Sequence, residues 1–226
     1  MNLECKRLMS EMEKHSDPVY ASWCKQYMRG QFEFIGVPVP LQRQLTKAWV
    51  KTIDKPSRSQ LRERVQYFWG LPEREYQRVA LDLLDTWRKQ LTFDDIAWIE
   101  QLITTKSWWD TVDTIAPNVI GFLYVSQPPE VTNEISNVLE KWNRSDNIWL
   151  QRTSILFQLS AKSRTNEQLL YRYIENLAAS NEFFVQKAIG WALRQYARVQ
   201  PQSVLQFVHS CELKPLSKRE ALKHLV

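Results

Sequence analysis

The chain has 226 residues, a net charge of +5, and five glycines against ten tryptophans. So few glycines disfavour a doubly wound sheet or an all-β sandwich, because both folds need many tight turns. The mild positive charge is compatible with an anionic partner but is too small to identify one. Cys5, Cys24 and Cys211 lie far apart with no C-x-x-C spacing, which excludes a disulfide framework and predicts reduced thiols.

The sequence predicts neither a metal site nor a cofactor. His15, His209 and His224 are not spaced like metal ligands. The first residues are charged throughout, unlike a secretory signal, and the longest apolar run, near 119–125, is too short to span a bilayer. We therefore expect a cytoplasmic protein, a monomer, with no membrane partner.

Taken in order, most of the chain has helical periodicity interrupted by short polar breaks. Apolar residues recur at helical spacing in 74–87 and again in 147–159. Breaks are predicted at Gly36–Pro40, Asp54–Ser57, Gly70–Pro72 and Ser126–Pro129. Strand-like alternation is nearly absent, so the sequence predicts an all-α protein.

A repeated phrase sets the register of these helices. Gln-Arg or Gln-Lys precedes an apolar run in "LQRQLTKAW", "YQRVALDLL", "LQRTSILFQL" and "VQKAIGWAL", and "SKREALKHL" is a weaker copy. The cations of these phrases are Arg43, Arg78, Arg152, Lys187 and Arg219, at intervals of 35, 74, 35 and 32 residues. Such a period predicts a HEAT-like solenoid of about six helical pairs, as a single domain over residues 1–226.

Equivalent positions of a solenoid line one concave face, so the repeated cations form a stripe suited to a polyanion backbone. The alternative is that each cation merely pairs with a nearby acid. The interval of 74 is close to two periods, and the residue 35 positions after Arg78 is Asp113. One position of the predicted basic stripe therefore carries the opposite charge.

Asp113 lies in "KSWWDTVDTIAP", residues 106–117. Ser107 and Asp110 have capping-box spacing, which predicts a structural role for Asp110. Trp108, Val112 and Ile115 are predicted to face the core, whereas Trp109 and Asp113 share another face, and Pro117 should kink or end the helix. For Asp113, a salt bridge to a cation of the stripe and stabilisation of a developing positive charge both remain open.

Four motifs resemble the bacterial AlkD family of alkylpurine DNA glycosylases. They are "TKSWWDTVD", "SDNIWLQR", "EFFVQKAIGWALRQYA" and "PLSKREALKH", and the likeness runs from about residue 12 onwards. The resemblance implies a C-shaped solenoid that holds duplex DNA in a concave basic groove. It also implies release of cationic N3- and N7-alkylated purines, leaving an abasic site, without base flipping and without a cofactor.

The same resemblance assigns roles to individual residues. It implies Asp113 as the catalytic carboxylate, Trp109 and Trp191 as the aromatic pair beside the sugar, and Arg152 as the cation that holds the backbone. Tyr27, in the segment 17–37, matches an aromatic residue at the DNA surface. Arg43, Arg78 and Lys187 of the stripe are further candidates for DNA binding, and Arg194 is either a phosphate contact or a solvated surface residue.

One segment departs from the family pattern. Active relatives can carry polar residues where this chain has Val37-Pro38-Val39-Pro40, so side-chain hydrogen bonds to the strand opposite a lesion could not form there. Two alternatives to a glycosylase stay open, namely a non-catalytic binder of DNA structure and a scaffold for an acidic protein partner. Asp146 is interpreted as a helix cap, and core or packing positions are expected for Trp23, Trp49, Trp69, Trp87, Trp98, Trp142 and Trp149.

Overall fold

The protein is all-α, as the sequence predicts. The structure is a computed structural model and describes residues 3–223, so His224 lies outside the described residues. Over this range it contains no β-strand, and an isolated bridge joins Glu33 to Glu73. The predicted interruptions of the helical pattern lie between helices or at their ends. The chain divides into two compact units, Met1–Leu91 and Thr92–Val226, which are described separately.

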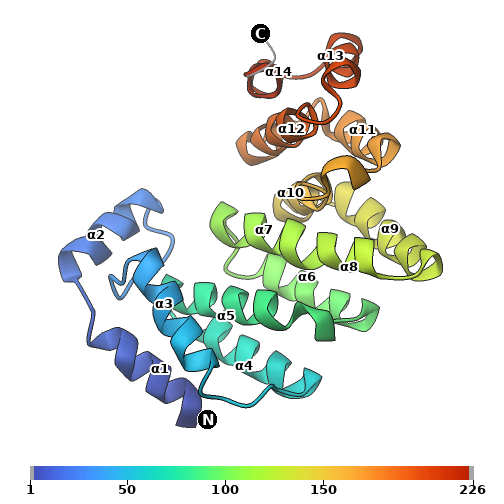
Figure 1. Cartoon of the computed structure of the whole chain (residues 1–226). Helices are drawn as coiled ribbons and strands as arrows, with labels where there is room; N and C mark the ends of the chain where they lie inside the picture. Colours follow the sequence, from blue (N-terminus) through green and yellow to red (C-terminus); the bar gives the residue numbers. More distant parts are fainter. Residues whose placement is uncertain (1–2, 224–226) are drawn as a thin grey trace. The chain divides into compact units, whose positions relative to one another are not determined.

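In the first unit the described residues form the helices α1 to α5 (Figure 1). A short 3-10 turn, Arg88–Gln90, follows α5. Its core lies where α3, α4 and α5 pack, and it includes the fully buried Leu61, Phe68 and Leu83. The helices are α1 (Leu3–Glu13), α2 (Pro18–Tyr27), α3 (Val39–Val50), α4 (Arg58–Gly70) and α5 (Arg74–Trp87).

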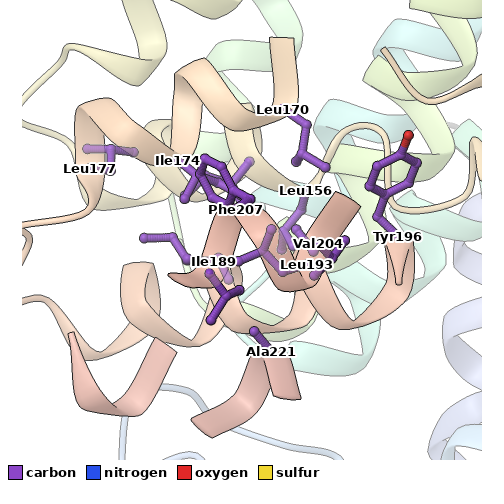
Figure 2. Close-up of a cluster of buried hydrophobic side chains, with 14 of the residues drawn as sticks. Leu156, Leu170, Ile174, Leu177, Ile189, Leu193, Tyr196, Val204, Phe207 and Ala221 are labelled. Carbon is purple, nitrogen blue, oxygen red and sulfur yellow. The ribbon is translucent and has the colours of Figure 1, made fainter. Parts of the chain in front are cut away.

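The second unit continues the pattern of short stacked helices. The helices are α6 (Ile96–Thr104), α7 (Trp109–Ile115), α8 (Gly121–Ser126), α9 (Pro129–Asn143), α10 (Ile148–Leu156), α11 (Glu167–Leu177), α12 (Phe183–Tyr196), α13 (Pro201–Ser210) and α14 (Pro215–Leu222). A large part of its core is a cluster of buried side chains, including Leu156, Ile174 and Leu193, supplied by α10 to α14 (Figure 2). Burial of these aliphatic faces is the main force that holds the short helices together.

The register predicted from the repeated phrase is confirmed by the helix boundaries. Each phased residue is the fifth residue of its helix: Arg43 in α3, Arg78 in α5, Asp113 in α7, Arg152 in α10, Lys187 in α12 and Arg219 in α14. Within the units, α3 packs on α5, α10 packs on both α7 and α12, and α12 packs on α14. The phased positions are thus structurally equivalent, which is the arrangement expected of an α-solenoid.

Candidate functional site

Helix α7 presents the residues that the sequence singles out. Val112 and Ile115 are fully buried, as predicted, and Pro117 interrupts the helix as predicted, because the chain passes through a π-helical turn (Ala116–Ile120) before α8 begins. A proline lacks the N–H that α-helical bonding requires, and a wider turn accommodates the loss. Asp113, one turn after Trp109, lies on the side of α7 away from these apolar anchors.

The predicted capping box at the start of α7 is wrong. The N-cap is Trp108, in an extended conformation, and no side chain caps the helix. The Ser107 hydroxyl instead donates to the Ile103 carbonyl at 2.7 Å, which ties it to the end of α6. Lys106, the residue before Ser107, has a φ of 50°, in the left-handed region that few residues other than glycine adopt.

Asp113 and Arg152 form a bidentate ion pair between α7 and α10. Arg152 Nε donates to Asp113 Oδ1 at 2.7 Å, and Nη2 donates to Oδ2 at 2.9 Å. The two side chains expose only 17% and 5% of their surface. A parallel pair of charge-assisted bonds fixes both groups in one orientation. This is the salt bridge that the sequence left open as a structural role for Asp113.

Burial and pairing act in opposite directions on the Asp113 carboxyl. Burial raises its pKa above the ordinary value of 3.8, because the charged form loses hydration. The hydrogen bonds and the positive charge of Arg152 oppose that effect, and the neighbouring Asp110 adds to it. The pair therefore holds a carboxylate in a place where an unpaired one would be strongly disfavoured.

The third donor of Arg152 reaches α12. Nη1 donates to the Phe184 carbonyl oxygen at 2.5 Å. Since its guanidinium is bonded on three nitrogens, Arg152 is a rigid link between α7, α10 and α12. The sequence did not identify Phe184 as part of this site, and the only available signal was the "EFF" of the third family motif.

An aromatic cluster surrounds this link. Trp108 contacts Phe184 and Trp149, with ring centroids 5.2 Å and 5.8 Å apart, and Trp149 lies 5.0 Å from Phe184. Trp108 was predicted to face the core, but its side chain is only half-buried. Its Nε1 is buried and has no hydrogen-bond partner. Trp149 is also half-buried, and its ring contacts with Trp108 and Phe184 agree with its interpretation as a packing residue.

The two tryptophans that the resemblance places beside the sugar are both half-buried. Trp109 is the first residue of α7, and Trp191 lies on α12, packed against the buried cluster of Figure 2. The helices α7, α10 and α12 thus supply Trp109, Asp113, Arg152 and Trp191 to the same unit. Their roles remain predictions.

Glu220 of α14 pairs with two of the predicted DNA-binding cations. Lys187 Nζ donates to Glu220 Oε1 at 3.0 Å, and Arg194 Nη1 donates to Oε2 at 2.7 Å. These two partners lower the pKa of Glu220 to about 2, so it is ionised across the physiological range. The sequence missed Glu220 because its partners lie 26 and 33 residues away.

Two of the three predicted DNA-binding residues of the first unit, Arg43 and Tyr27, are exposed. Arg43 is exposed on α3, whereas Arg78 is half-buried, with its guanidinium carbon 5.7 Å from the centre of the Phe34 ring. Tyr27 is 58% exposed on α2. Trp23, expected in the core, is 55% exposed on the same helix, which corrects that prediction. The buried residue of α2 is Cys24, so the face of the helix that carries Cys24 is the one that packs on the rest of the unit.

The segment Val37–Pro40 departs from the family pattern. The loop that leads into it is held by a buried acid that the sequence did not indicate. Glu75, fully buried on α5, accepts hydrogen bonds from the backbone N–H groups of Ile35, Gly36 and Val37 at 2.9–3.2 Å. Gly36 has a φ of 95°, and a Cβ there would lie 2.0 Å from the Asp17 carbonyl oxygen. This loop is therefore held by its backbone and needs no polar side chains of its own.

Most of the remaining tryptophans are buried, and the N-cap predicted for α10 is wrong. Trp49, Trp69, Trp98 and Trp142 are buried as expected, and Trp87 is half-buried. The cap of α10 is Asn147 and not Asp146, because the Asn147 side chain accepts from the N–H groups of Trp149 and Leu150.

The excess positive charge belongs to the first unit. Residues 1–91 contain 16 Lys and Arg against 11 Asp and Glu, whereas residues 92–226 contain 14 of each. In residues 3–223 no cluster of His, Cys, Asp and Glu is arranged to hold a metal ion. Within the same range no helix is long and apolar enough to cross a bilayer.

Comparisons with known proteins identify the family. The model of the DNA alkylation repair enzyme family matches residues 8–225. A solved structure described as a predicted DNA alkylation repair enzyme from Enterococcus faecalis is similar to the chain. The two share 31% identity and a TM-score of 0.83 over 93% of this chain and 97% of the other. No curated protein matches significantly. The resemblance seen in the sequence is thereby confirmed, and the chain belongs to the DNA alkylation repair enzyme family.

Proposed function

We propose that this protein is a DNA glycosylase that hydrolyses the N-glycosidic bond of cationic N3- and N7-alkylated purines in duplex DNA. The observation that supports this most directly is the buried Asp113 carboxylate, held in one orientation by two bonds from Arg152. A fixed negative charge in a poorly hydrated site suits a reaction in which positive charge develops. Family membership supports DNA as the substrate.

The proposed chemistry follows from the leaving group. An alkylated purine of this kind already carries a positive charge, so it departs with the bonding electrons as a neutral base and needs no general acid. The deoxyribose becomes oxocarbenium-like, and Asp113 stabilises that charge. Water then adds at C1′ and gives its proton to the carboxylate, which leaves an abasic site.

The other residues have supporting roles in this proposal. Trp109 and Trp191 place their ring faces against the sugar and add cation–π attraction to the oxocarbenium. Arg152 orients Asp113 and is a positioning residue, because its hydrogen bonds go to Asp113 and the Phe184 carbonyl. Unmodified purines are spared because they leave poorly without protonation.

Replacing Asp113 by Asn tests the proposal. The substitution keeps the shape of the side chain and removes its charge, so release of 7-methylguanine from duplex DNA should fall by about 10²-fold or more. Binding to the same duplex should change little. The matched control is Asp146→Asn, which removes an exposed carboxylate outside the site and should leave release unchanged. Near-normal release by Asp113→Asn would refute the mechanism.

A second candidate is a non-catalytic binder of DNA structure. The observation that favours it is the saturation of Asp113 by Arg152, since a carboxylate engaged in two bonds can be purely structural. This candidate predicts that the wild-type protein binds alkylated duplex yet releases no base. Counting abasic sites on methylated and unmodified duplexes, with binding measured in parallel, distinguishes the two candidates.

A further inference from the structure

Helix α2 carries a column of three nearly parallel aromatic rings, of which Trp23 and Tyr27 are exposed and Tyr20 is half-buried. The centroids of Tyr20 and Trp23 are 5.7 Å apart with an interplanar angle of 11°. Those of Trp23 and Tyr27 are 5.3 Å apart at 10°. Trp23 is the middle ring and still exposes 55% of its surface, and Tyr27 exposes 58%. Soluble proteins rarely leave large aromatic rings so exposed without a function for them.

The column is built into a helix with a fixed start. Asp17 caps α2 by accepting hydrogen bonds from the N–H groups of Val19 and Tyr20 at 2.9 Å and 3.1 Å. The Asp17 backbone lies against Gly36, where no side chain would fit. The three rings therefore sit on a preorganised support, which reduces the entropy lost when a flat ligand joins them.

The charges around the column are those that suit a phosphate backbone. Helix α2 contains Lys25 and no acidic residue, and the exposed Arg29 follows it. Lys25 is paired with Glu33, with Nζ and Oε1 2.5 Å apart. On this segment Arg29 is therefore the better candidate for a phosphate contact. The column also belongs to the unit that carries the whole excess of positive charge.

We propose that the α2 column (Tyr20, Trp23 and Tyr27) stacks an unpaired nucleobase of bound DNA. Flat π faces next to cations are the combination by which proteins hold unpaired bases in a strand. A base inside an intact duplex is already stacked on its neighbours, so the column selects one that has left the helix. This inference rests on the DNA-binding part of the proposed function and not on its chemistry.

The test uses DNA that carries 2-aminopurine, whose fluorescence falls when it stacks on an aromatic ring. The probe is placed in a single-base bulge of one duplex and opposite thymine in a matched duplex. Wild-type protein should quench the bulged probe and bind that duplex more tightly. Trp23→Ala and Tyr27→Ala should both abolish quenching. Trp23→Ala should weaken bulge binding by roughly tenfold, with less than about twofold effect on the matched duplex.

Two control variants sharpen the result. Val19→Ala changes the same face of α2, where Val19 is 81% exposed, without touching a ring, and it should quench like wild type. Tyr27→Phe keeps the ring and should also quench. The inference is refuted if the wild type fails to quench, or if Trp23→Ala weakens binding to both duplexes equally. It is also refuted if light scattering shows that this face forms a dimer that Trp23→Ala disrupts.

The same protein preparations are assayed for release of 7-methylguanine. Normal release without quenching by the wild type would refute the stacking inference alone. Quenching by the wild type without release would refute the glycosylase proposal alone. The two failures are therefore distinguishable.

Discussion

At the scale of single residues, the pairing of Asp113 with Arg152 is the feature on which most depends. Both side chains are largely removed from water, so each charge relies on the other. The sequence could indicate Asp113, because its place in the repeat register carries the wrong sign for a basic stripe. It could not choose between a structural and a catalytic role, since that depends on a partner 39 residues away.

Removing Arg152 should destabilise the protein strongly. Arg152→Ala leaves the Asp113 carboxylate buried without its partner, and we expect the free energy of unfolding to fall by about 3–5 kcal/mol in urea titrations. Lys187→Ala is the matched control, because Lys187 holds the equivalent place on α12 but its side chain is 38% exposed. That substitution should cost about 1 kcal/mol or less. Similar losses in the two variants would contradict the interpretation of Arg152 as a buried link.

The pH dependence of base release should report the Asp113 carboxyl. Its pKa is raised by burial, so activity should fall as the pH drops through a value above the ordinary 3.8. A raised folded-state pKa means that the native state binds this proton more readily than the unfolded chain, so protonating Asp113 does not itself favour unfolding. The measurement is release of 7-methylguanine against pH, corrected for release without enzyme. An acid limb at or below 3.8 would be inconsistent with this assignment.

At the scale of elements, some helix boundaries could be predicted from the sequence and others could not. The interruption at Pro117 could be predicted from the sequence, because a proline lacks the N–H that its own helix would need. The capping at the start of α7 could not be predicted, because the Ser107 hydroxyl bonds to the preceding helix α6 and not to α7. The exposure of Trp23 was equally hidden, because a helical spacing of aromatic residues does not say whether another helix covers that face.

The contact between α12 and α14 gives an element-scale prediction. A Cβ at Gly190 would lie 2.4 Å from Glu220 Cβ and 2.9 Å from the Ser217 carbonyl oxygen. Gly190→Ala should therefore push α14 away and lower the free energy of unfolding by about 1–3 kcal/mol, measured in urea. Gly70→Ala is the control, because no atom lies within 4 Å of its added Cβ. If the two variants were equally stable, α14 would not depend on this close approach.

At the scale of the whole molecule, charge is divided unequally between the two units. The first unit holds the excess of cations, and in the second unit Lys187 and Arg194 are already paired with Glu220. Electrostatic attraction of DNA should therefore rely more on the first unit than an even stripe of cations along the solenoid would imply.

Salt dependence of DNA binding tests this division. Arg43→Ala removes an exposed cation of the first unit and should reduce the slope of log affinity against log salt by about 1. Lys187→Ala removes a cation that is already paired, so its effect on the slope should be smaller. Affinities are measured on one unmodified duplex over a series of salt concentrations. Equal slopes for the two variants would favour the even stripe.

The sequence by itself determined the all-α class, the family and the register in which the phased residues from Arg43 to Arg219 recur. These features depend on local periodicity and on motifs read along the chain, so they need no knowledge of which helices meet. Only the tertiary structure decided that Arg152 bonds Asp113 and that Glu220 pairs with Lys187 and Arg194. It also decided that Trp23 and Tyr27 of α2 stay exposed. Burial and ion pairing depend on contacts between residues distant in the chain, and only packing brings those residues together.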